Sequence, residues 1–321
     1  MTIELAQFDH ANHLHLRAIA QLWNASFGQD MSVSERLVEY NTRPLPHAEQ
    51  AGRFVVHDGM PVAFVLTSMV HDEPELNSAS EGWVDALAVD PAHRNTNFGS
   101  TLLEWAENWL CAHGAEFARL GAGLRPFAPG IATSLGLTDF FMHRGYSVEY
   151  TTCDVAANLA HYATPPCVRE VPAAVRPAQP GQEPLILDFL RREFCGRWRY
   201  DAEALFAAGE RLSDFMLLWT EHGVQGCCLV TFEDSLRPIE RYFPYRLPRP
   251  WGHVGSIGVA ESRRGQGMGA YLLDAALRRL HDNGVNGCVI DWTMLLDFYG
   301  KFGFTPYREY QCLLKPLCEQ P

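Results

Sequence analysis

The chain has 321 residues, enough for two ordinary domains, and 47% of them are hydrophobic, which predicts a packed globular protein. Its formal net charge of −12 argues against non-specific nucleic-acid binding, which needs a basic surface. The nine cysteines form no C-x-x-C pair, and no signal peptide or bilayer-spanning apolar run is present, so we expect a cytoplasmic protein without a membrane partner.

The first half predicts a strand-rich domain with one clear amphipathic helix. His10, His13 and His15 lie close together, but without cysteine or carboxylate spacing they favour a solvated strand–helix connection, so we expect no metal site. Alternating apolar runs predict strands, and a 3.6-residue apolar period predicts a helix. The expected elements are two strands around a turn at Asp58–Gly59 (52–70), a strand (82–90), a helix (98–114), a short strand (115–120), a short helix (139–146) and a final strand.

A proline-rich stretch, 164–184, is the best linker candidate, and the same order of elements follows it. The helix is indicated by apolar residues at helical spacing, namely Leu272, Leu273, Ala276, Leu277 and Leu280. The expected elements are two strands around a turn near His222–Gly223 (215–232), a strand (252–260), a helix (267–284), a strand (285–291), a short helix (297–304) and a final strand.

The two halves are weakly similar to each other, which indicates a duplication. Arg94 aligns with Arg264 without a gap in the strand–loop–helix segment around each of them. After an insertion in the first half, "DFFMHRGY" (139–146) aligns with "DFYGKFGF" (297–304).

Gly265, Gly267 and Gly269 alternate just before the second long helix. Bare backbone N–H groups at the start of a helix form a ready anion site. A Walker-type loop is excluded, because Ala270 and Tyr271 stand where Lys and Ser/Thr are required. The glycines also match the dinucleotide-binding pattern G-x-G-x-x-G/A, so a dinucleotide site stays open. In that pattern the first glycine directly follows the strand, whereas here Ala260–Arg264 separates the strand from Gly265.

The same segment resembles the acetyl-CoA motif of the GCN5-related N-acetyltransferase (GNAT) family, R/Q-x-x-G-x-G/A. Its positions are Arg264, Gly265, Gln266, Gly267, Met268 and Gly269, with Ala270 next in the helix. A second segment, 297–304, resembles the short helix of that family that ends in F-Y-x-K-x-G-F. The resemblance implies acetyl-CoA as cofactor and an α/β fold of two tandem GNAT-like domains, each a mixed, mostly antiparallel sheet flanked by helices.

The resemblance also implies roles for single residues. Ile257 and Val259 would pair with the pantetheine arm, and the loop N–H groups would hold the pyrophosphate. Tyr299 would protonate the departing thiolate, and the N–H of Ile257 would donate to the thioester oxygen. His253 stands where some members carry a Glu base, and a His with a pKa of about 6.5 is a serviceable base. The sequence leaves open that Tyr299 is a core aromatic residue and that His253 only begins a strand.

The first half departs from the family pattern at each of these positions. Trp83 stands at the position of the base, Asn97 at the first motif glycine and Phe141 at the tyrosine. Phe141 cannot donate a proton, and Asn97 brings a side chain to the phosphate position. We therefore expect a degenerate GNAT-like domain in 1–163 and an intact domain that binds acetyl-CoA in 164–321, an organisation similar to tandem members of the mycothiol synthase type.

These observations predict an acetyl-CoA-dependent N-acetyltransferase that acts on a small-molecule amine by direct transfer in its second half. An acidic chain suits a cationic amine better than a nucleic acid. The alternative is a non-catalytic CoA-binding sensor or scaffold. A loop rich in arginine fits an acceptor-binding loop and a solvated loop equally well, its arginines being Arg237, Arg241, Arg246 and Arg249. The sequence indicates neither the acceptor nor the oligomeric state.

Overall fold

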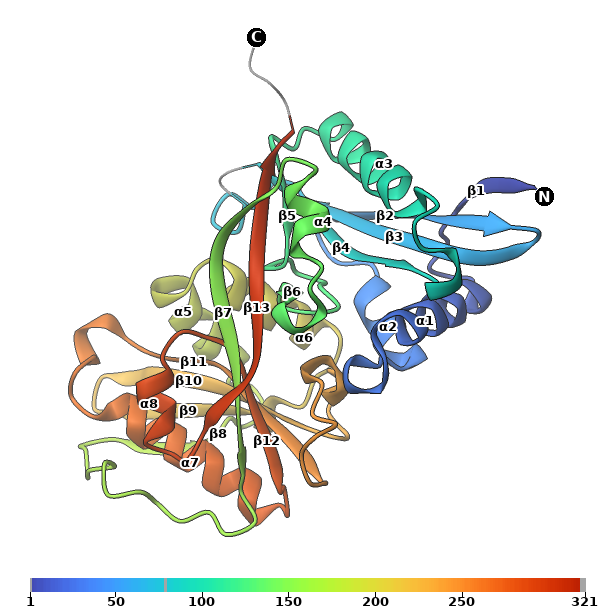
Figure 1. Cartoon of the computed structure of the whole chain (residues 1–321). Coiled ribbons are helices and arrows are strands. Elements are labelled where there is room, and N and C mark those ends of the chain that lie inside the picture. The colour runs from blue at the N-terminus through green and yellow to red at the C-terminus, as the bar shows by residue number, and fades with distance from the viewer. Residues whose placement is uncertain (1, 78–79, 318–321) are drawn as a thin grey trace. The chain divides into compact units, whose positions relative to one another are not determined.

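The computed structural model describes residues 2–77 and 80–317 (Figure 1). The chain divides into two compact units. The first consists of Met1–Thr152 together with Glu309–Pro321, and the second of Cys153–Arg308. Two long strands, β7 (Ser147–Asn158) and β13 (Thr305–Pro316), contribute residues to both units.

The first unit is a mixed sheet with helices on its two faces. Its sheet follows the order β1-β2-β3-β4-β5-β13, with only β4 and β5 parallel. Its other strands are β1 (Ile3–Gln7), β2 (Ala48–His57), β3 (Met60–Val70), β4 (Glu81–Val89), β5 (Phe117–Leu120) and β6 (Ile131–Ala132). Its helices are α1 (His13–Phe27), α2 (Glu35–Thr42), α3 (Phe98–Ala112) and α4 (Thr138–Met142).

Alternation along β2 and β3 explains the two layers of helices. Val55 and Val65 belong to the apolar cluster under α3, whereas Phe54 and Phe64 lie on the opposite face, where the Phe54 ring is 5.2 Å from the His15 ring of α1. Successive strand residues point to opposite faces, so one alternating sequence supplies both cores. Figure 1 shows α3 on one side of β2–β4 and α1 and α2 on the other.

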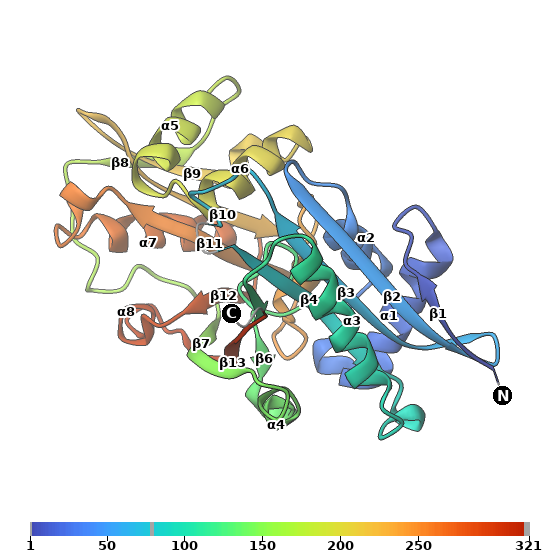
Figure 2. The same cartoon turned by 90° about the horizontal axis from the view of Figure 1, so that it is seen from above.

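The second unit repeats this architecture. Its strands follow the order β8-β9-β10-β11-β12-β7, with only β11 and β12 parallel. The strands are β8 (Ala174–Pro177), β9 (Phe215–Thr220), β10 (Gly223–Phe232), β11 (Trp251–Val259) and β12 (Gly287–Thr293). The helices are α5 (Glu183–Glu193), α6 (Arg197–Ala207), α7 (Met268–Asp282) and α8 (Leu296–Gly300). In Figure 2, α5 and α6 lie on one side of the sheet strands and α7 on the other.

The strands and long helices expected from the two repeats are present, and so is the duplication. The division into units differs from the boundary expected between residues 163 and 164. Residues 155–158 of β7 pair with β12 in the second unit, and Leu313–Pro316 of β13 pair with β5 in the first. Each half of the chain therefore supplies the strand that flanks the parallel strand of the other unit.

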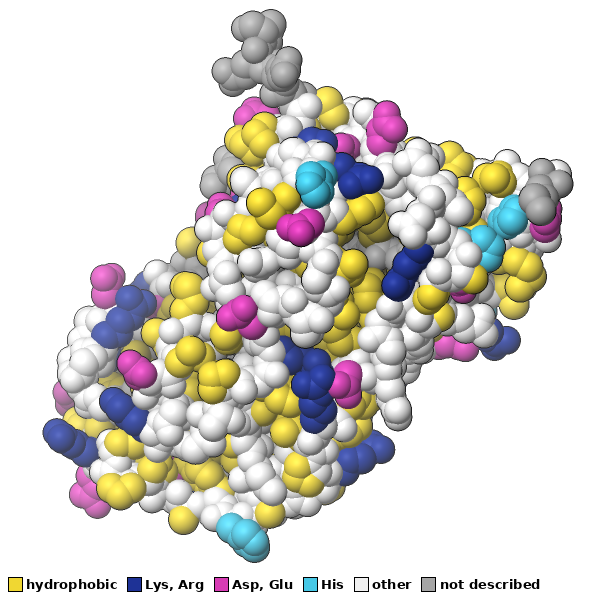
Figure 3. Space-filling model, viewed as in Figure 1, with side chains coloured by type: hydrophobic (Ala, Val, Ile, Leu, Met, Phe, Trp, Pro, Cys, Tyr) yellow, Lys and Arg dark blue, Asp and Glu magenta, His cyan; other side chains and the backbone are white. Residues whose placement is uncertain are grey.

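The surface carries charges of both signs. On the face in Figure 3, Lys and Arg side chains are interspersed with acidic and hydrophobic ones over both units. Within residues 2–77 and 80–317, no helix is long and apolar enough to cross a membrane.

Candidate active site

Strand β11 parts from β12 after three residue pairs. Parallel pairing joins Trp251–His253 to Gly287–Val289, whereas antiparallel pairing with β10 continues as far as Val259. Ser256, with φ of 47°, lies in β11 where the register with β10 shifts. The second half of β11 therefore has a ladder on one side and an open edge on the other.

The N–H groups of Ile257 and Val259 face that open edge. The N–H of Ala260 donates to the carbonyl of Gln225 in β10 over 2.8 Å. Because successive strand residues direct their N–H groups to opposite sides, Gly258 also faces β10, and its two neighbours face away. These are the two residues that the family resemblance assigned to pantetheine pairing.

The loop after β11 presents a bare helix start. Gly265 and Gly267 have φ of 74° and 83°, a region in which glycine carries no steric cost. Gly267 is the N-cap of α7, and no side chain of the described residues caps this end. A Cβ added at Gly265 or Gly269 would meet no described atom within 4 Å, and one at Gly267 would meet only Val171, at 3.5 Å. The loop of Gly265–Gly269 therefore has room for a large anion.

The remaining motif residues divide into side-chain and backbone contributors. Arg264 is exposed beside the glycines and can add a positive charge. The amide of Gln266 donates to the carbonyl of Ser262 over 2.9 Å and so fixes the loop. Met268 is 2% exposed and lies in the core, so only its backbone faces the loop. Ala270 is half-buried in the first turn of α7.

His253 is a core residue with two polar partners. Its Nε2 lies 2.8 Å from Oδ1 of Asp291, and its Nδ1 lies 3.4 Å from the hydroxyl of Thr231. Its ring stacks on that of Tyr242, with centroids 3.5 Å apart and planes 7° apart. The side chain is 1% exposed, whereas that of Asp291 is 25% exposed. A proton held by this pair therefore reaches the open side through the carboxylate.

Burial and neighbouring charge determine which member of the pair is ionised. Desolvation lowers the pKa of His253 below its ordinary value, with Arg237 and Arg241 acting in the same direction, although Asp291 opposes them. Burial alone would raise the pKa of Asp291, but His253 and the two arginines more than offset it and lower that pKa to about 2. At neutral pH the pair therefore holds a carboxylate beside a neutral imidazole.

Tyr299 lies on α8, 5% exposed, in the apolar cluster under α7. Burial raises its pKa to about 12, and the charge of Asp291 adds to that shift. The phenol is therefore protonated at neutral pH, as a proton donor must be. Its ring centroid lies 6.4 Å from that of Phe304, so the residue serves the core as well.

Asp291 is the site residue that the sequence-based reasoning missed. It interacts electrostatically with both His253 and Tyr299. The available signal was an acidic residue near the end of the strand that pairs in parallel with the motif strand.

Part of the arginine-rich loop is structural. The guanidinium of Arg249 donates to both carboxylate oxygens of Glu233 over 2.9 Å. The backbone N–H of Arg246 donates to the hydroxyl of Tyr307 over 3.3 Å. These contacts fix the ends of the loop.

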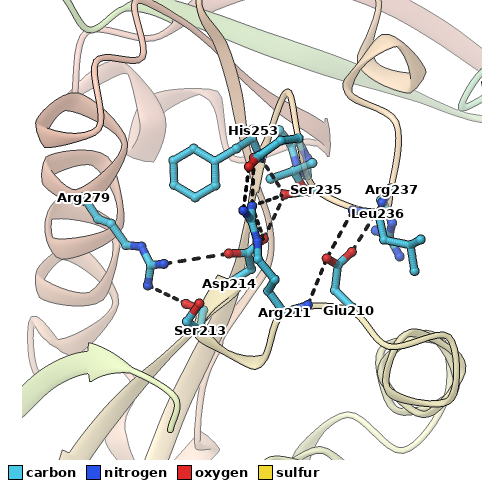
Figure 4. Close-up of polar contacts among 12 residues, drawn as sticks. Glu210, Arg211, Ser213, Asp214, Ser235, Leu236, Arg237, His253 and Arg279 are labelled. Carbon is cyan, nitrogen blue, oxygen red and sulfur yellow. Dashed lines mark hydrogen bonds and ion pairs between the residues drawn. The ribbon is translucent and has the colours of Figure 1, made fainter. Parts of the chain in front are cut away.

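Two other arginines of this loop act on the His253–Asp291 pair, Arg237 and Arg241. Figure 4 shows how the first is placed: Glu210 accepts hydrogen bonds from the backbone N–H groups of Leu236 and Arg237 over 3.2 and 3.3 Å. The loop thus places cations beside the candidate proton acceptor.

The first unit keeps the backbone of this site with different side chains. Asn95 and Asn97 have φ of 62° and 68°, matching the two loop glycines of the second unit, and Asn97 is the N-cap of α3. Trp83 and Phe141 are buried at the positions that align with His253 and Tyr299 of the second unit.

Comparisons with known proteins place both units in one family. Residues 16–124 match the model of the acetyltransferase (GNAT) family, and residues 212–306 match that of an acetyltransferase (GNAT) domain. No curated protein matches the chain.

Solved structures share the fold over the whole chain. A GCN5-related glucosamine N-acetyltransferase region of a fungal multi-domain β-N-acetylglucosaminidase superposes with a TM-score of 0.86 and 21% identity over 98% of this chain, which spans 38% of that longer one. A tandem GNAT protein from the clavulanic acid biosynthesis pathway gives 0.71 and 14% identity, with 100% of each chain covered. A GCN5-related N-acetyltransferase from Sphaerobacter thermophilus gives 0.68 and 18%, covering 99% of this chain and 97% of that one.

These matches confirm the fold class and the family expected from the two motifs, and with them acetyl-CoA as the family cofactor. The dinucleotide interpretation of the glycine loop is wrong, because the loop lies in a matched acetyltransferase domain. The chain belongs to the GNAT family of acetyltransferases and carries two GNAT domains in tandem.

Proposed function

We propose that the protein is an N-acetyltransferase for a small-molecule amine and that its second unit carries the chemistry. One observation carries the proposal: the open edge of β11 begins just after His253 of the His253–Asp291 pair and leads into the loop that ends at the bare start of α7. Cofactor, acceptor and proton relay can therefore meet along a single strand.

The fit of acetyl-CoA rests on the open cradle of the loop. The N–H groups from Gly265 to Ala270 and the positive end of α7 would bind the pyrophosphate, with Arg264 adding charge. The N–H groups of Ile257 and Val259 would hold the pantetheine arm as a strand edge does. Acetyl-CoA supplies the activated acyl group.

The residues of the second unit account for every proton in the transfer. The ionised carboxylate of Asp291 attracts the ammonium form of the acceptor and takes its proton, with His253 as its partner. The free amine then forms the N–C bond as the thioester C–S bond breaks. Tyr299 donates its proton to the leaving thiolate. The Asp291–His253 pair passes the proton of the ammonium group to the solvent, takes the second proton as the amide forms, and returns that proton to the phenolate of Tyr299.

An amino sugar is the first acceptor to try. Arg237, which acts on the pair, lies 3.5 Å from Asp201, and charges of both signs suit a polar amine rather than an apolar one. The solved structure described as a glucosamine N-acetyltransferase region shares the fold at a TM-score of 0.86. A polyamine is the second acceptor to try, because it is also cationic but has no hydroxyl groups.

The test is thiol release from acetyl-CoA with D-glucosamine or spermidine as acceptor. Tyr299→Phe and Asp291→Asn should each lower amine-dependent turnover by about 10- to 1000-fold, because each removes one proton-transfer group while keeping the shape. The affinity for acetyl-CoA, measured by calorimetry, should stay unchanged in both variants. Wild-type turnover in both would overturn this assignment. Binding of acetyl-CoA without turnover of any amine would favour the sensor or scaffold alternative.

A further inference from the structure

Three arginines of the second unit act on the carboxylate of Asp291. Arg237 and Arg241 lower its pKa, and Asp291 in turn acts on Arg197, whose pKa it raises. Arg197 is the first residue of α6, whereas the other two belong to the loop between β10 and β11. Two separate elements therefore bring positive charge to the same carboxylate.

These arginines share two carboxylates. Arg197 lies 3.7 Å from Oδ2 of Asp201, and Arg237 lies 3.5 Å from the same oxygen. Burial lowers the pKa of Arg197, Asp201 and Asp291 oppose that shift, and Arg241 and Arg237 add to it. Because three guanidinium groups act here with two carboxylates, these five groups together carry one positive charge.

The next acidic residue of α6 neutralises other arginines. Glu203 accepts from Arg191 over 2.9 Å and from Arg199 over 2.8 Å. It therefore does not offset the positive charge beside Asp291, whose electrostatic partners do not include it.

The cluster is accessible and borders the open edge of β11. The side chains of Arg197 and Asp201 are each 21% exposed. A cavity of about 10 Å³ has Asp201, Arg237 and Ser256 in its lining. Ser256 lies where the register of β11 with β10 shifts, just after the pairing with β12 has ended. A group bound at the cluster therefore lies beside the strand along which the thioester is proposed to bind.

A bulge in β12 places Arg197 next to the proposed proton acceptor. The register of β12 with β7 shifts between Ile290 and Thr293, and Trp292 within that interval has φ of 48°. Bulges beside active sites direct side chains to new positions. The guanidinium carbon of Arg197 lies 4.7 Å from the centre of the Trp292 ring. The residue that directly follows Asp291 therefore holds this cation in place.

We propose that the arginine cluster, Arg197, Arg237 and Arg241, binds an anionic group of the acceptor, so that the substrate is an amine that also carries a phosphate or a carboxylate. The inference rests on the function proposed above and narrows the substrate class of the same site. The ammonium end of the acceptor lies at Asp291, and the oxygens of its anionic end accept hydrogen bonds from the guanidinium groups. Two charged ends of opposite sign orient the amine toward the edge of β11.

The binding arm of the test is calorimetric titration of three sugars into the protein saturated with CoA: D-glucosamine, D-glucosamine 6-phosphate and D-glucosaminic acid. One of the two anionic sugars should bind about 10- to 100-fold more tightly than D-glucosamine, because charge-assisted hydrogen bonds are gained. The preferred sugar shows whether the anionic group is a phosphate or a carboxylate.

Three variants assign that preference to the cluster. Arg197→Gln should abolish it, and Arg197→Lys, which keeps the charge, should retain most of it. Arg191→Gln removes an exposed arginine of α5 and is the matched control, which should keep the preference in full. Equal affinities of the wild type for the three sugars, or a preference that survives in Arg197→Gln, would overturn the inference.

The turnover arm measures thiol release from acetyl-CoA with the same sugars. Arg197→Gln should raise KM for the preferred anionic sugar by about 10- to 100-fold and change kcat by less than about twofold, because the anionic group lies away from the reacting atoms. Turnover of D-glucosamine should be unchanged. A fall in kcat for every sugar would contradict a role in acceptor binding.

The two proposals fail in different ways. If an anionic sugar binds with a preference that depends on Arg197 but no sugar is acetylated, the anion site stands and the proposed function fails for these acceptors. If all three sugars are acetylated with equal kcat/KM, the transferase function stands and the anion site is wrong.

Discussion

Single residues decide which of the two units can do which part of the reaction. In the second unit, the proposed acid is Tyr299, and the proposed proton acceptors are His253 and Asp291, which are joined by a 2.8 Å contact. The first unit has one buried carboxylate, Asp85, and no tyrosine at the corresponding place, where Phe141 stands.

The pH dependence of the second unit follows from its ionised carboxylate. The lowered pKa of His253 keeps the imidazole neutral, and that of Asp291, about 2, keeps the carboxylate charged through the acidic range. The kcat/KM of amine-dependent turnover should fall only below the ordinary His pKa of about 6.5. Thiol-release assays at a series of pH values from 5 to 8 measure this dependence. A pH above 7 at which kcat/KM reaches half of its maximum would contradict it.

The raised pKa of Asp85 predicts how the free energy of unfolding depends on pH. Burial raises this pKa to about 6, so the folded state binds a proton that the unfolded state releases near pH 4, and stability is lost as pH rises through that window. Asp85→Asn removes this loss. The free energy of unfolding is measured in urea for both proteins at pH 4 and at pH 7.5. The difference between Asp85→Asn and wild type should be more favourable to the variant at pH 7.5 than at pH 4, by on the order of 2 kcal/mol. An equal difference at both pH values would show that the carboxyl does not titrate in this range.

At the residue scale, the sequence indicates most where the candidate site consists of consecutive residues. The run from Arg264 to Ala270 carries its own backbone and charge pattern, and it is the start of a helix. The partnership of His253 with Asp291 depends on the parallel pairing of β11 with β12, and no local pattern indicates which residues that pairing brings together.

Among the elements, β11 and β4 each pair with their parallel neighbour over only part of their length. The alternating apolar pattern predicted both strands, but the point at which each leaves its parallel neighbour is a property of the sheet and not of the strand. The turn at Asp58–Gly59, by contrast, was predicted correctly, because both residues have positive φ and both residue types tolerate it.

The open edge of β11 predicts a pattern of amide exchange. The N–H groups of Ile257 and Val259 should exchange rapidly in the free protein and slow by about tenfold or more with saturating acetyl-CoA, because the cofactor supplies the missing acceptors. The N–H of Ala260, already bonded to Gln225, is the internal control and should be protected in both states. Residue-resolved hydrogen exchange by NMR measures all three. Equal protection of Ile257 and Ala260 without ligand would contradict the open edge.

At the scale of the whole molecule, the chain completes each unit with a strand from the other half. Sequence repeats predicted two domains, and the family matches confirm them. The repeats could not show that residues 309–316 pack in the first unit, since no local pattern indicates with which strand the final strand pairs.

Because β13 contributes residues to both units, two core mutations near each other in the sequence should destabilise different units. Leu313 is fully buried in the core of the first unit, and Phe304, nine residues earlier, lies in the core of the second. Leu313→Ala and Phe304→Ala should each cost about 3 kcal/mol, in different units. Limited proteolysis with mass spectrometry should find first cuts within 2–152 for Leu313→Ala and within 153–308 for Phe304→Ala. First cuts in the same unit for both variants would contradict the assignment.

The most direct test of the central claim compares Gly267→Asp with Gly267→Asn in acetyl-CoA titration and in amine-dependent thiol release. Both variants place a side chain of the same size at φ of 83°, where the added Cβ meets only Val171 at 3.5 Å, so they differ in charge alone. If the second unit binds acetyl-CoA at this loop and carries the main turnover, the Asp variant loses one binding site and most of the turnover, and the Asn variant keeps both. Wild-type binding and turnover in the Asp variant would show that the chemistry lies elsewhere.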